Sequence, residues 1–228
     1  MLSAILLAAG KGKRLNSAIP KPLVKIGKLP AIVHSLKALE DNPRIDEIIV
    51  VLNAANRREI SGVLKKYHFG KIKAFVLGGV RRQDSVYNGL KAVSSRSGWV
   101  LIHDSARPFI DNSSIARVVS AARKYGAALL AVRPKATVKV SRNSGMVDKT
   151  LNRQCLWEAQ TPQVFRKEMI LKAYKRYSRS DVTDDASLAE MAGAKVKIIE
   201  GSYKNIKITT SEDLLLAALI AKGRAYAI

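Results

Sequence analysis

LLAAGKGKRL at residues 6–15 joins the end of an apolar strand to a glycine turn that carries several cations, and PKP follows at residues 20–22. Gly10 and Gly12 lack a Cβ atom, so the backbone of this turn can adopt positive φ and bring its N–H groups against phosphate oxygens. Arg14 and Lys21 add positive charge to the same stretch. The pattern predicts a turn that holds a nucleoside triphosphate.

The spacing in this turn differs from two common phosphate-binding motifs. The dinucleotide fingerprint needs a third glycine where Leu15 stands, and a P-loop needs Gly-Lys-Ser/Thr after a four-residue gap. Strand-then-glycine turns also occur in α/β proteins for purely structural reasons, so the turn alone does not assign a function. The run resembles the signature of nucleotidyltransferases, which move a nucleoside monophosphate from a triphosphate onto a phosphorylated sugar or alcohol.

Length and composition predict one compact domain over residues 1–228. The chain is 47% hydrophobic and can bury a sizeable core. Its apolar runs fall short of the roughly 20 residues that cross a membrane, and Met1 leads into the first strand without a basic leader. We therefore expect a cytoplasmic protein without a membrane partner. Cys155 is the single cysteine, which excludes an internal disulfide, and we interpret it as an ordinary buried or interface residue.

The formal net charge of +22 raises the alternative of a nucleic-acid-binding protein. Lys and Arg are spread through almost every segment, however, without a long basic block, an aromatic RNA-binding signature or zinc-finger spacing. We therefore predict a solvated cationic surface suited to anionic small substrates, and no specific nucleic-acid partner.

Strand and helix patterns alternate along the chain, which is typical of a doubly wound α/β fold with a mostly parallel sheet. The predicted strands are Ser3–Ala8, Glu47–Leu52, Lys73–Leu77, Trp99–His103, Ala127–Val132 and Val196–Ile199. The predicted helices are Ala31–Leu39, Arg57–Tyr67, Asp84–Val93, Ser113–Tyr125, Lys167–Tyr177, Asp184–Ala192 and Glu212–Lys222. In the last helix, which begins with a capping box from Thr210 to Asp213, we expect the core-facing residues to be Leu214, Leu215, Ala218 and Leu219. A ligand is expected at the carboxyl ends of the strands.

Residues 136–158 break the alternation and predict a projecting β-arm. Thr137–Val140, a turn at Asn143-Ser144-Gly145 and Met146–Asp148 form the pattern of a hairpin, and Gln154–Ala159 forms a further extended piece. Because an isolated hairpin is marginally stable, its exposed face requires a partner surface. We therefore expect the arm, as defined by residues 136–158, to mediate a twofold homodimer.

Two further motifs end strands at the same predicted edge of the sheet. HDSARP at residues 103–108 closes one strand with an acid and an arginine, and GGVRRQDSV at residues 78–86 ends the preceding strand in a second glycine turn. Asp104 and Arg107 have a structural alternative, as a helix cap and its ion-pair partner. Two glycine turns beside an acidic strand end can instead enclose one nucleotide.

Several blocks now occur in order across nearly the whole chain: LAAGxGxR, Pro-Lys, GGxxRxxSV, HDxARP, a central Thr, an Arg before LWxAxTPQ, TDDA and NIKIT. Together they resemble the 2-C-methyl-D-erythritol 4-phosphate cytidylyltransferases of the nonmevalonate isoprenoid pathway. Related enzymes that use pentitol phosphates share many of these blocks. The resemblance implies a Rossmann-like nucleotidyltransferase fold and transfer of CMP from CTP to a polyol phosphate.

The resemblance also implies a set of site residues. The cytidine and ribose would be held by Ala8, Ala9, Gly10, Gly12, Gly79, Val80 and Ser85, several through backbone atoms. Catalytic roles fall to Arg14, Lys21, Arg153 and Lys207. The acceptor side would be formed by Asp104, Ser105, Ala106, Arg107, Thr137 and Thr183, with Thr137 and Arg153 reaching the neighbouring subunit's site. Val80 and Ala136 stand where many relatives carry Asp.

The implied reaction brings two anions together, so it needs fixed cations rather than a protein nucleophile. An acceptor phosphate oxygen attacks the α-phosphorus of CTP, and pyrophosphate leaves. Mg²⁺ bound mainly through the CTP phosphates would neutralise part of the charge, with Asp104 as the most plausible protein carboxylate near it.

Asp184 and Asp185 could form a second metal site, but we favour a helix cap. For Arg81 and Arg82, phosphate binding and a solvated role remain equally open, and Trp157 suits arm packing better than base stacking.

Two alternatives to the leading hypothesis stay open at the level of sequence. Ribitol 5-phosphate could replace methylerythritol phosphate as the acceptor in the same chemistry. A basic nucleotide- or RNA-binding module could have kept the fold without catalysis, although the joint presence of Arg14, Lys21, Arg153 and Lys207 argues against it.

Overall fold

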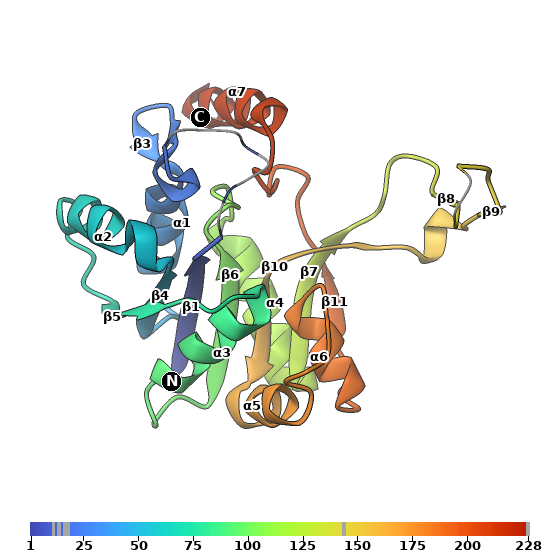
Figure 1. Cartoon of the computed structure of the whole chain (residues 1–228), viewed down its shortest axis with the longest axis horizontal. Coiled ribbons are helices and arrows are strands. Elements are labelled where there is room, and N and C mark those ends of the chain that lie inside the picture. Colours follow the sequence, from blue (N-terminus) through green and yellow to red (C-terminus); the bar gives the residue numbers. More distant parts are fainter. Residues whose placement is uncertain (11, 13–14, 16–18, 143–144, 227–228) are drawn as a thin grey trace.

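A computed structural model gives the structure of the chain, and it describes residues 1–10, 12, 15, 19–142 and 145–226, with no side-chain description for 224–226. Seven strands form one sheet in the order β11-β7-β10-β6-β1-β4-β5 (Figure 1). These strands are β1 (Leu2–Ala8), β4 (Glu47–Leu52), β5 (Ile72–Leu77), β6 (Trp99–Asp104), β7 (Ala127–Val132), β10 (Glu158–Arg166) and β11 (Lys197–Glu200). A separate small pair consists of β2 (Lys25–Ile26) and β3 (Leu29–Pro30).

The sheet is mostly parallel, as predicted. Strand β1 pairs in parallel with β4 and β6, and the pairs β4–β5 and β7–β11 are parallel as well. Strand β10 is the exception, because it runs antiparallel to both β6 and β7. We did not predict this strand, and the predicted extended piece Gln154–Ala159 is wrong at its start, where η4 (Arg153–Cys155) forms a 3-10 helix. Strand β10 lacks an apolar run since its buried residues include Gln160, Thr161 and Gln163.

Helices cover both faces of the sheet, which confirms the doubly wound prediction (Figure 1). On one face lie α1 (Ala31–Glu40), α2 (Arg57–Lys65) and α4 (Asn112–Tyr125). On the other lie α3 (Arg82–Ala92), α5 (Lys167–Arg176) and α6 (Asp185–Met191). Successive residues of β1 serve opposite cores, because Leu6 packs in the first cluster and Leu7 in the second. Such strands, buried on both faces, explain the continuous apolar runs. Two further 3-10 helices are η2 (Lys21–Leu23) and η3 (Ala54–Asn56).

Helix α7 (Ser211–Tyr226) lies beyond the carboxyl end of the sheet, at the top of Figure 1. Its start is fixed as expected, since the carboxylate of Asp213 accepts the N–H groups of Thr209 and Thr210. The predicted inward face is only partly right, however: Leu214 packs inward, but the other three predicted residues do not. Ala217 is fully buried, whereas Leu215 is 71% exposed, Leu219 is 65% exposed and Ala218 is also exposed. The helix packs against β2, the start of α1 and nearby loop residues rather than against the seven-stranded sheet, so it buries only a narrow stripe.

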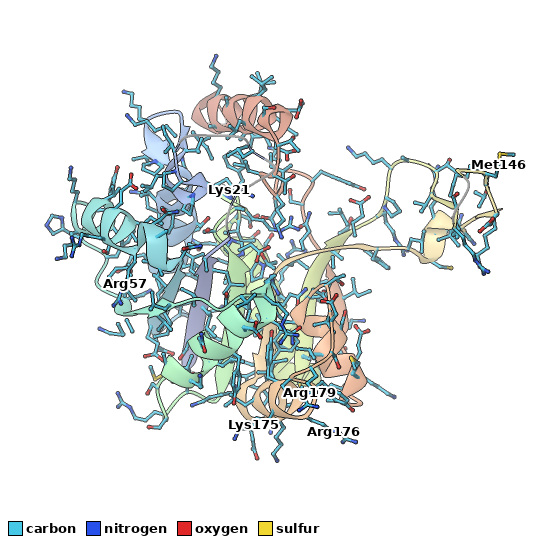
Figure 2. The ribbon with its side chains drawn as sticks, in the orientation of Figure 1. Lys21, Arg57, Met146, Lys175, Arg176 and Arg179 are labelled. Atoms are coloured by element: carbon cyan, nitrogen blue, oxygen red, sulfur yellow. The ribbon has the colours of Figure 1, made fainter. Side chains whose placement is uncertain are left out.

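The arm leaves the body of the molecule beside β7 and β10 and projects far to one side (Figure 1). Near its outer end, β8 (Lys139–Val140) pairs antiparallel with β9 (Lys149–Thr150), which confirms a hairpin. The predicted return strand Met146–Asp148 is wrong by position, because the pairing begins at Lys149. Of the predicted turn, Asn143 and Ser144 lie outside the described residues. Met146 lies at the outer end of the arm (Figure 2).

Within the described ranges, no helix combines the length and the apolar character that a membrane span requires.

Candidate active site

A cavity of about 460 Å³ opens at the carboxyl edge of the sheet, where the motifs were expected to meet. Its walls come from the ends of β1, β4 and β6, from both glycine turns, from η2 and from the segment that leads into α7. Twelve predicted site residues line it: Ala8, Ala9, Gly10, Gly12, Lys21, Gly79, Val80, Ser85, Asp104, Ser105, Ala106 and Lys207. Arg14 lies outside the described residues, so the structure does not place it.

The first glycine turn carries β1 into the cavity. Gly12 has a φ of +64°, a conformation that favours glycine, whereas Gly10 is not in that region. A Cβ on Gly12 would also meet the Cβ of Lys21 at 3.1 Å. Asn53, which follows β4, donates from Nδ2 to the carbonyl of Ala9 at 3.3 Å. Asn53 therefore fixes Ala9 at the start of the turn, and Gly12 lies beside Lys21.

The second glycine turn packs directly against the first. A Cβ on Gly78 would come within 2.4 Å of the Cβ of Ala9, so the two turns approach closely because this position has no side chain. Gly79 donates its N–H to Oγ of Ser85 at 3.0 Å, and a Cβ there would lie 2.3 Å from that of Asp84. Val80 is 96% exposed, so its side chain is free of packing constraints. We call the two turns, residues 8–10, 12 and 78–85, the cradle.

Asp104 stands at the end of β6 between two cations. Its Oδ2 lies 2.7 Å from Nζ of Lys207, and its Oδ1 lies 3.2 Å from Nη2 of Arg82. Burial disfavours the charged carboxylate, but the charges of Arg82 and Lys207 outweigh it and hold the pKa of Asp104 well below its usual range. The site therefore presents a permanently ionised carboxylate with both oxygens engaged.

A buried chain of hydrogen bonds through Thr161 and His103 holds the backbone of Asp104. The backbone N–H of Asp104 donates to Oγ1 of Thr161, which lies 3.0 Å from Nδ1 of His103. Nε2 of His103 lies 3.1 Å from the carbonyl of Arg107, which can only accept, so Nε2 carries the proton. Burial lowers the pKa of His103 to about 4, which keeps the ring neutral. His103 thus acts in the scaffold, and the sequence motif did not reveal that role.

Arg107 anchors the segment that carries Lys207. Its Nη1 donates to the carbonyl of Asn205 at 2.7 Å, and the N–H of Ile208 donates to the carbonyl of Ala106 at 2.8 Å. Burial, the largest effect, lowers the pKa of Arg107 despite the nearby charge of Asp104. Arg107 is not among the residues that line the cavity. Its contacts explain why an arginine follows the strand by three residues.

The structure does not bring the remaining predicted residues into the cavity. Thr137 and Arg153 are exposed on the arm, where Nη1 of Arg153 donates to the carbonyl of Lys135 at 2.8 Å. Thr183 is exposed and precedes α6. Cys155 is exposed on the arm, so the buried alternative for it is wrong. Trp157 packs where the arm joins the body of the molecule, and the guanidinium of Arg133 lies 3.8 Å from the centre of its ring.

Some lining residues escaped the sequence reasoning or were assigned incompletely. Asn53 and Thr209 line the cavity and were not singled out; the position of Asn53 directly after a strand was the available signal. Arg82 is a half-buried bridge rather than a fully solvated residue, since it contacts both Asp104 and Asp185. Asp184 caps α6 through the N–H of Ser187, as favoured, but Asp185 is fully buried in an ion pair.

The site lies at the edge of a mostly parallel sheet and combines two contacting glycine turns, a strand-end carboxylate and flanking cations. This combination defines an α/β nucleotidyltransferase. A family profile described as 2-C-methyl-D-erythritol 4-phosphate cytidylyltransferase matches residues 2–222. The chain belongs to this family.

Individual proteins agree with this assignment. The chain is 45% identical over 223 residues to the 2-C-methyl-D-erythritol 4-phosphate cytidylyltransferase of Geobacillus kaustophilus, covering 97% of each chain. Among solved structures, it is similar to the 4-diphosphocytidyl-2C-methyl-D-erythritol synthase of Anaerococcus prevotii, with a TM-score of 0.86 and 36% identity over 97% of this chain and 96% of that one. The cytidylyltransferase of Francisella tularensis gives a TM-score of 0.80 at 36% identity, over 96% and 99% of the two chains.

Proposed function

We propose that this protein transfers CMP from CTP to 2-C-methyl-D-erythritol 4-phosphate, forming 4-diphosphocytidyl-2-C-methyl-D-erythritol and pyrophosphate. The observation that carries the proposal is one cavity with the cradle on one side and Lys21, Lys207 and Asp104 around it. Donor and acceptor are both anions, so fixed cations in one cavity bring them together and oppose their repulsion. Membership of the family supports the choice of donor and acceptor.

In this proposal the cradle binds the cytidine and ribose of CTP. The contacts come largely from backbone groups, because side chains at several of its positions would block the approach. The residues assigned to this role are Ala8, Ala9, Gly10, Gly12, Gly79, Val80 and Ser85. A backbone contact at Val80 is compatible with the loss of the Asp that many relatives carry.

The chemical step requires an attack on the α-phosphorus of CTP by an oxygen of the acceptor phosphate. That phosphate is already ionised at neutral pH, so the step needs no general base. The bond to the β-phosphate oxygen breaks, and pyrophosphate leaves with the negative charge. Lys21, together with Arg14 from the sequence, stabilises the charge that grows on the transferring phosphate.

Mg²⁺ fits this site as an ion carried chiefly by the triphosphate. Asp104 is the carboxylate among the described lining residues, and its two oxygens already contact Arg82 and Lys207. In the part of the chain that the structure describes, no group of three or more His, Cys, Asp or Glu side chains could hold a metal. Phosphate oxygens would therefore supply most ligands, with at most one from Asp104. The bound ion would neutralise phosphate charge.

On the acceptor side, we assign Asp104, Ser105, Ala106, Arg107, Thr183 and Lys207 within one chain and Thr137 and Arg153 from a second copy. The arm projects away from the body of its own chain (Figure 1), and both Thr137 and Arg153 are exposed on it and absent from the lining of that chain's cavity. In a twofold homodimer, each arm would complete the site of its neighbour. Arg107 would act indirectly, by holding the segment that carries Lys207.

A cytoplasmic location belongs to the proposal because CTP is a cytoplasmic nucleotide. The absence of a specific nucleic-acid partner stays a prediction. Cations lie on distant parts of the molecule, with Arg57 on one side and Lys175, Arg176 and Arg179 at the end opposite α7 (Figure 2). Such dispersion supports salt-sensitive, sequence-indifferent binding of polyanions at most.

Pyrophosphate release tests the proposal directly. The purified chain is incubated with Mg²⁺ and each of CTP, UTP, ATP and GTP, with methylerythritol phosphate or ribitol 5-phosphate as the acceptor. We expect release with CTP and methylerythritol phosphate, and the cytidine diphospho-alcohol as the second product. Preference for ribitol 5-phosphate would transfer the assignment to that acceptor. No release with any pair, from protein that binds CTP, would favour a non-catalytic binding module.

A further inference from the structure

Arg82 connects the cavity to the interior of the protein. It stands at the start of α3, and its guanidinium donates from Nε and Nη2 to Oδ1 of Asp104 at 3.3 and 3.2 Å. The same group donates from Nη1 and Nη2 to the two carboxylate oxygens of Asp185 at 3.1 and 2.9 Å. One planar guanidinium therefore spans two carboxylates, a geometry that an ammonium group cannot reproduce.

The contact with Arg82 neutralises the negative charge of Asp185. Its side chain is fully buried at the first position of α6. Besides Arg82, it accepts a hydrogen bond from the hydroxyl of Tyr174 at 2.5 Å. Burial and the charge of Asp185 raise the pKa of Tyr174, so this hydroxyl remains a neutral donor. A buried carboxylate is costly without a cation, and Arg82 is the cation in contact with it.

Asp104 extends the same row of charges to the acceptor side. Its Oδ1 faces Arg82, and its Oδ2 lies 2.7 Å from Lys207. The charges alternate in the order Lys207, Asp104, Arg82, Asp185. The row joins the segment before α7, the end of β6, the start of α3 and the start of α6. Thr183 lies two residues before Asp185 on the segment that enters α6.

We propose that Asp185 and Arg82 are positioning residues, which hold Lys207 and the turn of Thr183 in place for the acceptor. The inference rests on the proposed function, since it names groups that orient that reaction's acceptor. Asp185 fixes the guanidinium of Arg82, and the guanidinium fixes Oδ1 of Asp104. The second oxygen of Asp104, Oδ2, then fixes the ammonium group of Lys207. Arg82 belongs to both the row and the cradle, but the backbone of the two glycine turns has contacts of its own through Asn53 and Ser85, so we expect cytidine binding to change less than acceptor binding.

A purely structural role for Asp185 is the rival explanation, and the structure allows the two to be separated. The start of α6 has anchors of its own: Asp184 accepts from Ser187 N, and Oε1 of Gln163 accepts from the N–H of Ala186 at 2.9 Å. Replacing Asp185 by Asn keeps the shape of the side chain and one acceptor oxygen. The Asp185→Asn variant should therefore fold, while Arg82 loses one of its two charged partners.

The test combines steady-state kinetics with a double-mutant cycle over Asp185→Asn, Arg82→Gln and the double variant. Loss of one charge-assisted contact is expected to lower kcat and raise the KM for the acceptor about tenfold each, with the KM for CTP within about twofold. The double variant should be no worse than Arg82→Gln alone, because Asp185 acts through Arg82. Arg82→Lys should recover little, since it keeps the charge but loses the fork.

Lys172→Gln is the control, because it removes an exposed ion pair with Glu168 that includes no member of this row. Arg82→Gln leaves a buried carboxylate unpaired and can unfold the chain, so the double variant with two neutral amides is the decisive comparison. Additive losses in the cycle would overturn the proposal. So would an Asp185→Asn variant that loses only thermal stability, or one that weakens CTP and acceptor binding equally.

A crystal structure of the Asp185→Asn variant gives a readout besides activity. We expect the contact between Nζ of Lys207 and Asp104 to lengthen or break and the turn at Thr183 to shift. An unchanged contact and turn would contradict the proposed positioning. Should the native chain release no pyrophosphate at all, the proposed function fails, while this structural comparison still decides whether the row holds Lys207.

Discussion

The cradle and the arm both consist of turns and short stretches of backbone, but their own chain holds them to very different extents. In the cradle, Gly78 packs within contact of Ala9, Asn53 bonds the carbonyl of Ala9, and Ser85 accepts from Gly79. On the arm, β8 and β9 pair over two residues each, and both Thr137 and Arg153 are exposed.

This difference indicates that the two sides of the proposed reaction are prepared differently. In the described residues of the cradle, contacts within one chain fix the backbone, whereas Thr137 and Arg153 are exposed on the arm. We expect the proposed partner subunit to position these two residues. A short isolated hairpin is marginally stable, so the arm gains order from such a surface. The donor side should therefore respond to local substitutions, and the acceptor side to assembly.

The largest effect is expected from Lys21→Ala, which tests whether the preorganised side supplies catalysis as well as binding. Charge on the phosphates grows toward the transition state, so losing this cation should raise the barrier by about 2–4 kcal/mol and affect CTP binding far less. Single-turnover rates and CTP binding by calorimetry separate the two effects. The sequence predicts the same for Arg14→Ala. Lys172→Gln, at an exposed pair, serves as the charge-matched control.

Near-normal turnover of both the Lys21 and the Arg14 variants at saturating CTP would contradict these roles. A parallel loss of binding and turnover would mean that the cations act on the ground state.

The second effect concerns the arm and is tested by mixing subunits. Arg153→Ala and Lys207→Ala should each be nearly inactive, because one residue acts from the partner subunit and the other within its own chain. Heterodimers of the two variants contain one site with both residues intact. Subunit exchange should therefore restore up to about half the native activity of each heterodimer.

Exchange has to be demonstrated independently, for example by native mass spectrometry of differently tagged subunits. Heterodimers without recovered activity would exclude the assignment of Arg153 to the neighbouring site. A fully active monomer would remove the basis for the dimer.

The sequence predicts the buried strands and the residues at their ends well, and it predicts poorly the features that depend on distant partners. Strands such as Glu47–Leu52 and Ala127–Val132 were predicted to the residue, because both faces of each are buried and the sequence is continuously apolar. Twelve predicted site residues line one cavity because strand ends in a parallel sheet share an edge.

The missed features depend on partners that lie far away in the chain. Strand β10 was missed since its polar side chains are satisfied by distant groups, as when Nε2 of Gln163 donates to Oδ2 of Asp184 at 2.7 Å. Arg82 could not be distinguished from Arg81 because the difference is the buried Asp185, 103 residues further on. Three of the four residues predicted on the inward face of α7 were wrong, because the helix packs on a small cluster outside the main sheet, where periodicity alone does not define the buried stripe.

The third prediction concerns the pH dependence of stability and His103, the buried residue next to Asp104 on β6. Burial lowers the pKa of His103 to about 4 from an ordinary value of 6.5, so the unfolded chain binds the proton first as pH falls. This contribution to stability is complete above pH 6.5 and is lost between pH 6.5 and 4, by about 3 kcal/mol. The carboxylate of Asp104, whose pKa is lowered, loses its contribution only at lower pH.

Urea unfolding at several pH values from 4 to 7 measures this loss. His103→Gln is the matched control, because its amide can donate to the carbonyl of Arg107 and accept from Thr161 without titrating. The native chain should lose more stability than the variant across this window. Parallel curves for the two proteins would exclude His103 as the source.

The smallest effect is expected from adding one methyl group to the cradle, at Gly79. A Cβ there would lie 2.3 Å from the Cβ of Asp84 and 3.2 Å from its backbone carbon, so the start of α3 has to move. Such overpacking costs about 1–3 kcal/mol, and because Gly79 lines the cavity the cost should appear in the KM for CTP as well as in stability. Gly98→Ala is the control, since a Cβ at that glycine meets no atom within 4 Å and the residue lies at the opposite end of β6. Thermal unfolding and CTP titration of both variants make the comparison. If Gly79→Ala bound CTP as tightly as Gly98→Ala, the second glycine turn would not be the rigid half of the nucleotide site.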